Sequence, residues 1–568
     1  MDYKNKFAEL IFQVIDTKEI QEIDVLKNIS KPPKPELGDL SFATFFLSKI
    51  LKKAPPIISE EIVSKLNSDL FVFSSFNGYV NAKINNKVFV KDTLSEIFET
   101  KDKYGYSTKE NPTQYVIDTF QPNPLKMLHI GHIRNGVVGE AVYRLLKANG
   151  DDPIPVTYMG DIGTHIAKWL WYYNNFVEDS EKEIPTKEVS KWFGNIYLAA
   201  GKKLEENEDY KKDIDELQVK LMSDEKLQKQ LKVLVNASFN GYMEVAKELD
   251  LTIKDNIFES ECEVEFNKLK PSLFEKYSDI FVPDDGAIVA NLKDESLGNF
   301  ILIKGNGALL YGAKDIGLLN IKKNKFPNCN NFLYVVASEQ DFYFSQLFRL
   351  FKLIYPNINN KHISYGLITT PQGKMKSREG QILLYEDFRD QLYEKVNDVL
   401  TKNGLESNKK IIQDISFGTI KFEMLKIAIN KNLLFDLEKS TDLQGDSSAY
   451  VQYSAVRAQS ILQKSNSQNI SLDDLNLDVS FEDSEMLLVN KLFEYKEKLK
   501  YASENYKPNV IVNYSLELAH VFNKFYNNCQ VLHSNDSIKN NRLLLTSAFL
   551  IVIKNALNIL GINIPEAM

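Results

Sequence analysis

The chain has few cysteines and no long apolar run. Three of its 568 residues are cysteine, and Cys262, Cys329 and Cys529 lie far apart, without a Cys-x-x-Cys pair. This spacing excludes a disulfide framework and argues against a structural zinc site. The apolar run from Leu543 to Ile553 has 11 residues, too few to span a membrane, so we expect a buried helix there. The first residues lack the apolar core of a signal peptide, so a cytoplasmic protein is expected.

Arginine and histidine are also scarce. Lys and Arg together number 69, yet only seven are Arg, and there are six His. An Arg kept against this bias suits planar, bidentate binding, and Arg134 and Arg378 both fall in candidate phosphate-binding segments. The net charge of −8 argues against a general polyanion-coating protein, although a local basic face can still bind nucleic acid. The length predicts several domains.

Two of the histidines form the most informative motif, His-Ile-Gly-His from His129 to His132. An apolar run, 115–120, predicts a strand before it, and the periodic stretch 133–146 predicts a helix after it. A helix N-terminus after a strand and a tight turn favours an anion, and Gly131 lets a nucleotide approach the backbone. We interpret the motif as a nucleotide site in which both imidazoles contact phosphate. The alternative is a chance pair of surface or core histidines.

A second candidate phosphate segment spans 365–380. A predicted strand enters a loop marked by Gly and Pro that carries three cations and a hydroxyl: Lys374, Lys376, Ser377 and Arg378. Such a loop suits a triphosphate, whose charge has to be neutralised as pyrophosphate leaves. The alternative is a solvated basic loop.

Hydrophobic patterning divides the chain into three parts. Residues 1–105 predict a small α+β module, with a helix over 38–53 and a β-hairpin that turns at Asn77-Gly78. Residues 112–386 alternate strands and helices, which predicts a parallel sheet with crossover helices and a helical insertion at about 178–285. The expected strands are 115–120, 154–158, 287–292, 300–303, 332–337 and 363–369. Residues 387–568 predict helices throughout: a junction over 387–447, then a bundle.

These segments together resemble a known family. The block Asp118–Arg134, the Gly-Asp block at 158–165, the stretch Tyr311–Asp315, the stretch 334–341 and the segment Ala449–Arg457 follow one another in the order found in class I aminoacyl-tRNA synthetases, specifically the arginyl-tRNA synthetase family. The loop at 374–378 is similar to that class's KMSKS signature. The resemblance implies an α/β fold: a Rossmann-like catalytic domain, an N-terminal tRNA-binding module and an anticodon-binding helical bundle over 448–568.

The resemblance also implies the reaction and the residues. Arginine is activated with ATP to arginyl-adenylate and then moved to the terminal ribose of tRNA-Arg. ATP, as its Mg²⁺ complex, is expected at His129, Gly131, His132, Gly366, Lys374, Lys376, Ser377 and Arg378, with Lys126 sharing the catalytic work of the histidines and lysines. Arginine is expected at Asp118, Asn123, Glu259, Tyr311, Asp315 and Gln340. Tyr450, Tyr453, Arg457, Asn523 and Tyr526 are expected to contact tRNA bases. A monomer without a dedicated metal site or a membrane partner is expected.

Alternatives remain at this point. A different nucleotidyltransferase with a His-x-Gly-His motif needs no RNA-binding modules, and a non-catalytic tRNA-binding relative does not need His129, His132, Lys374 and Asp315 intact. Each acidic residue could form a surface salt bridge instead of binding arginine, and each tyrosine of the helical domain could pack in the core instead of contacting tRNA.

Overall fold

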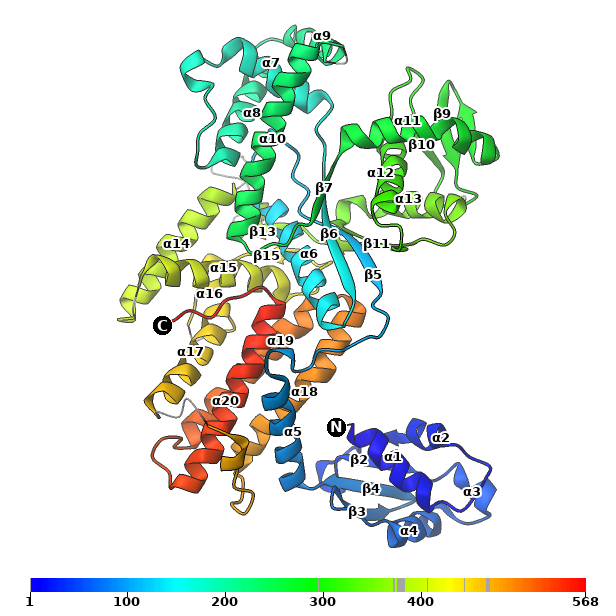
Figure 1. The fold of residues 1–568 in the computed structure, drawn as a ribbon, viewed down its shortest axis with the longest axis vertical. Coiled ribbons are helices and arrows are strands. Elements are labelled where there is room, and N and C mark those ends of the chain that lie inside the picture. Colours follow the sequence, from blue (N-terminus) through cyan, green and yellow to red (C-terminus); the bar gives the residue numbers. More distant parts are fainter. Residues whose placement is uncertain are drawn as a thin grey trace. The chain divides into compact units, whose positions relative to one another are not determined.

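The computed structural model describes residues 2–221, 223–294, 296–370, 384–405, 407–443, 445–465 and 470–568, together with the backbone of Gly373 and Lys374. The chain divides into two compact units. The first unit comprises Met1–Tyr104, Ser460–Phe493 and Val521–Val552; the second comprises Gly105–Gln459, Glu494–His520 and Ile553–Met568. The ribbon is shown in Figure 1.

The N-terminal part of the first unit is an antiparallel sheet with helices. Its strands run in the order β1 (Ile29–Ser30), β2 (Leu40–Ala43), β4 (Tyr79–Ile84) and β3 (Phe71–Phe76). The predicted hairpin is confirmed: β3 pairs with β4, and Asn77 (φ 50°) and Gly78 (φ 85°) make the left-handed turn between them. The helices are α1 (Tyr3–Val14), α2 (Glu22–Lys27), α3 (Leu47–Leu51), α4 (Pro55–Lys65) and α5 (Asn86–Thr100).

The helix predicted over 38–53 is wrong. Leu40–Ala43 is a strand that pairs with β1 and β4, and only Leu47–Leu51 is helical. The apolar spacing fits either structure locally, and pairing on both edges decides for the strand. Pro55 begins α4. Proline is tolerated at the first helical position because the N–H that it lacks would have no partner within the helix there.

A five-stranded parallel sheet forms the centre of the second unit. Its order is β12 (Asn359–Tyr365), β11 (Asn331–Ala337), β5 (Gln114–Asp118), β6 (Asp152–Met159) and β7 (Asp255–Phe258). Strands β5, β6 and β11 were predicted and are confirmed; the predicted strand 363–369 covers only the last three residues of β12 and the first two of β13, and β7 was not predicted. If the five strands are numbered 1 to 5 in chain order, their spatial order from β7 to β12 is 3-2-1-4-5. The direction in which the chain adds strands therefore reverses between β5 and β11. Ligands of open parallel sheets bind at such a reversal, beyond the carboxyl ends of the strands.

Two strands predicted for this sheet belong elsewhere. β9 (Ala287–Asn291) and β10 (Asn299–Ile303) form a separate antiparallel sheet with β8 (Phe281–Asp284). The predicted strands exist, but the prediction of their partners was wrong, because an apolar run does not encode which strand it pairs with. Phe281, Phe300 and Leu302 are buried in one core with Phe332 of β11.

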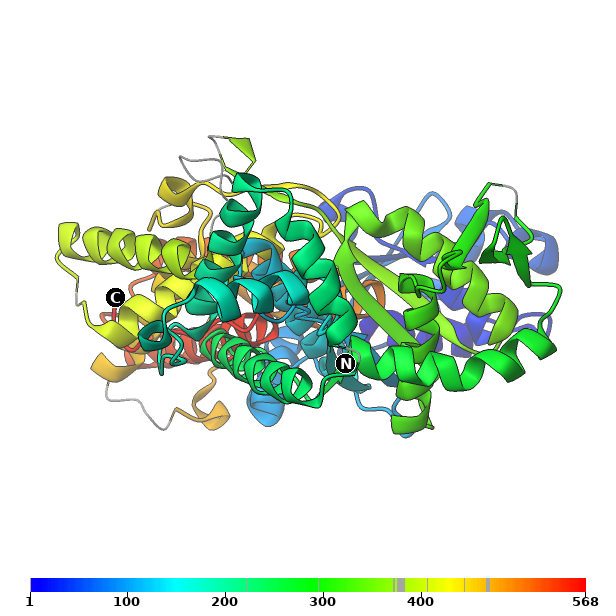
Figure 2. The same ribbon diagram turned by 90° about the horizontal axis from the view of Figure 1, so that it is seen from above.

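Helices surround the parallel sheet. The predicted helix 133–146 is confirmed within α6 (Ile130–Ala148). Two further groups are separate in both ribbon views (Figures 1 and 2): α7–α10, around the buried Trp169, and α11–α13. Their bounds are α7 (Thr164–Phe176), α8 (Val189–Glu206), α9 (Tyr210–Lys220), α10 (Glu225–Glu248), α11 (Glu259–Lys276), α12 (Tyr311–Lys325) and α13 (Asp341–Ile354). Strands β7 and β8 and the whole of α11 fall within the range 178–285, where the sequence predicted a helical insertion.

The remaining elements are mostly helical, as predicted. They are α14 (Tyr385–Lys402), α15 (Lys409–Lys426), α16 (Leu437–Ser440), α17 (Ser448–Lys464), α18 (Asp483–Asn505), α19 (Pro508–Asn528) and α20 (Asp536–Ile559). Short strands β13 (Ile368–Thr370), β14 (Gly373–Lys374) and β15 (Leu433–Leu434) form a small third sheet in the second unit. Helix α20 is long and apolar enough to cross a membrane, but 72% of its most apolar stretch is buried inside the protein, as in the core helix of a soluble domain.

Candidate active site

The His-Ile-Gly-His motif begins helix α6 at the carboxyl end of the sheet. His129 has extended backbone geometry and is the N-cap, and its backbone N–H donates to His132 Nδ1 at 3.4 Å. The two rings stack with their centroids 3.7 Å apart. The structure therefore brings both predicted histidines together at the point where the order of the strands reverses.

Both histidines are neutral at pH 7. Burial, reinforced by Lys126, lowers the pKa of His129 to about 4, and burial also lowers the pKa of His132 well below its usual range. Because His132 Nδ1 accepts a hydrogen bond, the proton of the neutral ring resides on Nε2. His132 thus offers one N–H donor without a net charge.

The loop between β5 and α6 is held by the helices of the α7–α10 group. The Tyr242 hydroxyl of α10 bonds the carbonyls of Asn123 (2.9 Å) and Lys126 (2.6 Å). Ser238 Oγ accepts from the N–H of Leu125 at 3.0 Å, and Leu125 has a left-handed φ of 60°. These contacts fix a strained turn immediately before the histidines.

Two lysines gather on one aromatic ring beside this loop. Lys126 Nζ lies 5.4 Å from the centroid of Tyr197, and Lys168 Nζ lies 3.7 Å from it. Burial lowers the pKa of both ammonium groups. Within the described part of the chain neither lysine has a carboxylate within 4.0 Å. Unpaired cations next to the histidines favour an anionic ligand.

Among the acidic residues expected to bind arginine, Asp315 is the one without a cationic partner. It lies on α12 and accepts a hydrogen bond from the Tyr343 hydroxyl of α13. Burial raises its pKa to about 7, although the Tyr343 bond and Lys322 oppose the shift. No described Lys or Arg lies within salt-bridge distance of Asp315. A half-buried carboxylate without a counter-ion suits a cationic ligand.

The other two acids are already paired. Asp118 is only 2% exposed and forms an ion pair with the buried Lys322. Its Oδ1 has no hydrogen-bond partner among the described residues, nor does the buried Tyr158 hydroxyl. Glu259 pairs with Lys314, which also lies 2.9 Å from Glu263.

The remaining expected arginine contacts differ in burial. Asn123 Oδ1 accepts from the N–H of Gly160 at 3.3 Å. A Cβ on Gly160 would lie 2.9 Å from this oxygen and 2.7 Å from Glu259 Oε2, so a larger residue there would displace one or both side chains. Tyr311, at the start of α12, is 67% exposed, and Gln340 is also exposed.

The expected triphosphate loop is described only at its base. Lys374 lies on β14, whose backbone pairs with Thr369 of β13. Lys376, Ser377 and Arg378 lie outside the described residues. Gly366 stands where β12 leads into β13, and a Cβ there would lie 2.3 Å from the carbonyl oxygen of Lys431.

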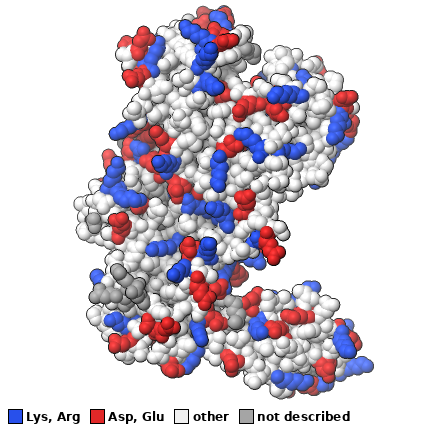
Figure 3. Space-filling view, viewed as in Figure 1, with Lys and Arg blue, Asp and Glu red and all other residues white. Residues whose placement is uncertain are grey.

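The expected tRNA contacts fall in both compact units. Tyr450, Tyr453 and Arg457 belong to the second unit, whereas Asn523 and Tyr526 belong to the first. The Tyr450 hydroxyl is 3.0 Å from His520 Nδ1, and the Arg457 guanidinium lies 4.7 Å from the centre of the Tyr453 ring. Acidic and basic side chains are interspersed over the face shown in Figure 3.

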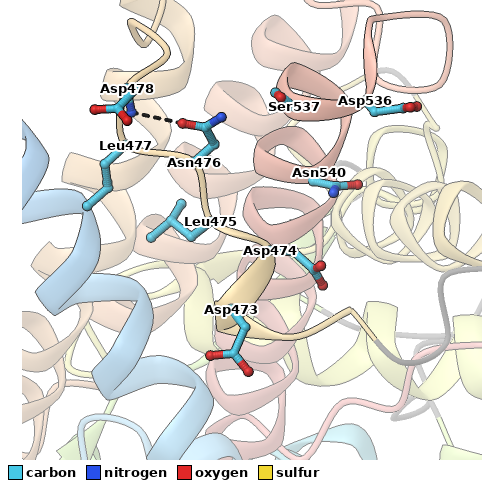
Figure 4. A pocket seen from close by; sticks show the side chains of 9 residues that line it. All are labelled: Asp473, Asp474, Leu475, Asn476, Leu477, Asp478, Asp536, Ser537 and Asn540. Carbon is cyan, nitrogen blue, oxygen red and sulfur yellow. Dashed lines mark hydrogen bonds between the residues drawn. The ribbon is translucent and has the colours of Figure 1, made fainter.

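A pocket in the first unit does not share this chemistry. Figure 4 shows that carboxylates and amides line it, and they come from the segment 473–478 and the start of α20. Four aspartates are among these residues: Asp473, Asp474, Asp478 and Asp536. This acidic lining disfavours phosphate.

Several residues that shape the site were not predicted as functional. Tyr242, Tyr343 and Lys322 contact it from α10, α13 and α12. Their partners are 28 to 204 residues away along the chain, so no local pattern identifies them.

Comparison with known proteins agrees with this geometry. The family model for the catalytic domain of class I (R) tRNA synthetases matches residues 93–437, that for the DALR anticodon binding domain matches 451–568, and that for the arginyl tRNA synthetase N terminal domain matches 3–84. The arginine–tRNA ligase of Borrelia turicatae is 32% identical over 585 residues, covering 100% of this chain and 99% of the relative. That of Clostridium botulinum is 30% identical over 577 residues and covers 100% of both.

The fold also matches a solved structure. Arginyl-tRNA synthetase from Thermus thermophilus superimposes with a TM-score of 0.79 at 22% identity, over 100% of both chains. The reversed parallel sheet and the histidine motif after β5 define the catalytic domain of a class I aminoacyl-tRNA synthetase. Within that class the chain belongs to the arginyl-tRNA synthetase family. Its reaction is therefore the activation of arginine with ATP and the transfer of arginine to tRNA-Arg.

Proposed function

We propose that the site described above performs arginine activation with the following division of roles. His129, Gly131 and His132 contact ATP, and Lys126 and Lys374 neutralise its phosphates together with Gly366, Lys376, Ser377 and Arg378. Magnesium arrives bound to ATP, held by phosphate oxygens. The observation that supports this is the pair of neutral, stacked imidazoles at a helix N-terminus, beside lysines without carboxylate partners.

The chemistry requires charge stabilisation rather than a covalent intermediate on the protein. The carboxylate of arginine attacks the α-phosphorus, the bond to the bridging oxygen breaks, and pyrophosphate leaves with the electron pair. Negative charge grows on the phosphate oxygens during this step. A neutral His132 with its proton on Nε2 donates one hydrogen bond to this charge, and the lysines supply the positive field.

The arginine side chain is recognised by Asp315 first. Because Asp118 and Glu259 are paired with lysines, Asp315 is the acid whose partner the substrate guanidinium supplies. Asn123, Tyr311 and Gln340 complete the arginine site, with Asp118 and Glu259 setting its negative potential. A carboxylate in a fixed position accepts the planar fork of arginine and discriminates against the ammonium of lysine.

The tRNA contacts extend the proposal beyond the catalytic domain. Bases of the tRNA stack on Tyr450, Tyr453 and Tyr526 or bond to Arg457 and Asn523. We also propose that the protein acts as a cytoplasmic monomer, away from membranes. Its native mass in light scattering should then be that of one 65.1 kDa chain.

The decisive experiment is ATP–pyrophosphate exchange with each of the twenty amino acids, with and without tRNA. We expect exchange with arginine alone, and only when tRNA-Arg is present. Exchange driven by another amino acid would contradict the assignment of Asp315 to arginine recognition. Exchange without tRNA would contradict the expected dependence of activation on bound tRNA.

A further inference from the structure

Arg134 is a fully buried cation two residues after His132 on α6. The sequence placed it in a candidate phosphate-binding segment, but its guanidinium is bonded to protein backbone. Four N–H groups donate to four carbonyls: Nη1 to Gly366 (2.6 Å) and Leu367 (3.1 Å), and Nη2 to Ile429 (3.2 Å) and Lys431 (3.0 Å). The fifth, Nε–H, is buried without a described partner. The four terminal N–H groups, which would form a fork on a phosphate, are therefore already bonded to carbonyls.

The arrangement requires arginine rather than lysine. No described carboxylate pairs with Arg134, and burial lowers its pKa to about 10, so it remains charged at pH 7. A buried cation without a counter-ion is costly unless hydrogen bonds replace its lost hydration, and four of the five Arg134 donors have such bonds. Only a planar fork with several donors reaches four carbonyls on two chain segments, because an ammonium has three donors on one atom.

The two segments that Arg134 holds are also bonded to each other. The N–H of Gly366 donates to Ile429 at 2.9 Å, and the N–H of Leu433 donates to Leu367 at 2.8 Å. Gly366 has no side chain to separate them, and a Cβ there would clash with Lys431. The segments therefore form one tightly packed frame next to α6.

This frame continues into the strand that carries Lys374. β13 pairs with β15 on one edge and with β14 on the other, so that Thr369 is opposite Lys374. An unbroken series of backbone bonds thus runs from the frame to Lys374. Arg134 joins it to the helix whose first turn holds His129 and His132.

We propose that Arg134 is a positioning residue for arginine activation, which fixes the strand bearing Lys374 relative to the two histidines. This inference rests on the phosphate roles proposed above for Lys374 and the histidines. Arg134 touches no substrate. It sets the distance between groups that contact opposite ends of the same triphosphate, and small misplacements of such groups lower rates strongly.

The first test is a double-mutant cycle. Arg134→Lys, Lys374→Ala and the double variant are compared with the wild type in ATP–pyrophosphate exchange with arginine and tRNA. We expect Arg134→Lys to lower the exchange rate by about 10- to 100-fold, with the KM for arginine within about twofold. The double variant should lose less than the product of the two single losses, because Arg134 acts in part through Lys374. Losses that multiply would overturn the proposal.

Two further variants guard against an unspecific loss of fold. Asn432→Ala removes the exposed Oδ1 that accepts from the N–H of Leu367 at 2.9 Å, and it should lower exchange several-fold with the same dependence on Lys374. Arg349→Lys is the matched control, because Arg349 donates to one carbonyl, Leu292, outside the frame. Its rate should match the wild type; a loss equal to that of Arg134→Lys would contradict the proposal.

The second test does not depend on activity. Amide hydrogen exchange in peptides covering 362–370 and 429–435 should rise in Arg134→Lys and remain unchanged in Arg349→Lys. Unchanged protection in Arg134→Lys would refute the positioning role even if catalysis is impaired. If the wild type itself fails to exchange pyrophosphate with arginine, the proposed function fails, and the amide exchange still judges Arg134 separately.

Discussion

At the scale of single residues, Asp315 makes arginine use dependent on pH. Its pKa is raised to about 7, and the ionised form is the one that binds a guanidinium. The carboxylate therefore gains its proton, and loses affinity, as pH falls through 7. We expect the KM for arginine to rise about tenfold from pH 8 to pH 6, following the ionised fraction. Exchange kinetics across this range measure it.

The control for this pH dependence is Tyr343→Phe. The Tyr343 hydroxyl donates to Asp315 and lowers its pKa, so its removal should move the rise in KM to higher pH. The KM for ATP should stay nearly constant in both proteins. A KM for arginine that does not change with pH would show that Asp315 is not the recognition group.

Gly160 is predicted to leave room for two side chains of the arginine site. In Gly160→Ala the new Cβ would crowd Asn123 Oδ1 and Glu259 Oε2, both closer than 3.0 Å, and displace them. We expect the KM for arginine to rise by about tenfold or more, which corresponds to about 1.4 kcal/mol. Gly201→Ala in α8 is the control, because its Cβ would meet only Lys168 Nζ at 3.9 Å. An equal loss in both variants would indicate a general effect on folding.

At the scale of elements, α10 holds the loop that precedes the histidines. Tyr242→Phe deletes the hydroxyl that bonds Asn123 and Lys126. We expect a loss of about 1–3 kcal/mol in the free energy of unfolding, measured with urea, and a lower rate of exchange. Tyr173→Phe is matched to it, because that hydroxyl bonds the carbonyl of Lys182, away from the loop. It should cost stability without slowing exchange; slowing in both would refute the role of α10.

The sequence predicts an element well when nearby residues determine it, and poorly when contacts with distant residues do. Strands β5, β6 and β11 carry apolar runs and were found. Strand β12 is mostly polar and was predicted only over its last three residues, and β7 is four residues long and begins Asp255-Asn256, with little apolar signal. The strands at 287–291 and 299–303 were found too, but assigned to the wrong sheet. Pairing is a long-range choice that apolar periodicity does not record.

The site follows the same division. His129 and His132 were identifiable because the motif is local and sits between a strand and a helix. The hydrogen bonds of Arg134 reach carbonyls 232 to 297 residues further along the chain, so no local sequence pattern predicts them. Nor does the sequence separate Asp315 from Asp118, because only the fold gives one of them a lysine partner.

At the scale of the whole molecule, binding of tRNA has to overcome a net charge of −8. Lysines and arginines that contact phosphates release counter-ions, so affinity falls as salt rises. We expect the Kd for tRNA-Arg to rise at least about tenfold between 50 and 200 mM salt, while the Kd for arginine changes far less, because its site is half-buried. A salt titration with labelled tRNA measures both the affinity and the slope.

The role of Arg457 can be read from the same titration. If its guanidinium bonds or stacks on an exposed base, Arg457→Lys should weaken tRNA binding about five- to tenfold while leaving the salt slope unchanged, since the charge is kept but the planar face over Tyr453 is lost. A phosphate contact predicts instead a nearly unchanged affinity for Arg457→Lys and a shallower slope for Arg457→Gln. Unchanged affinity and slope in both variants would remove Arg457 from the tRNA interface.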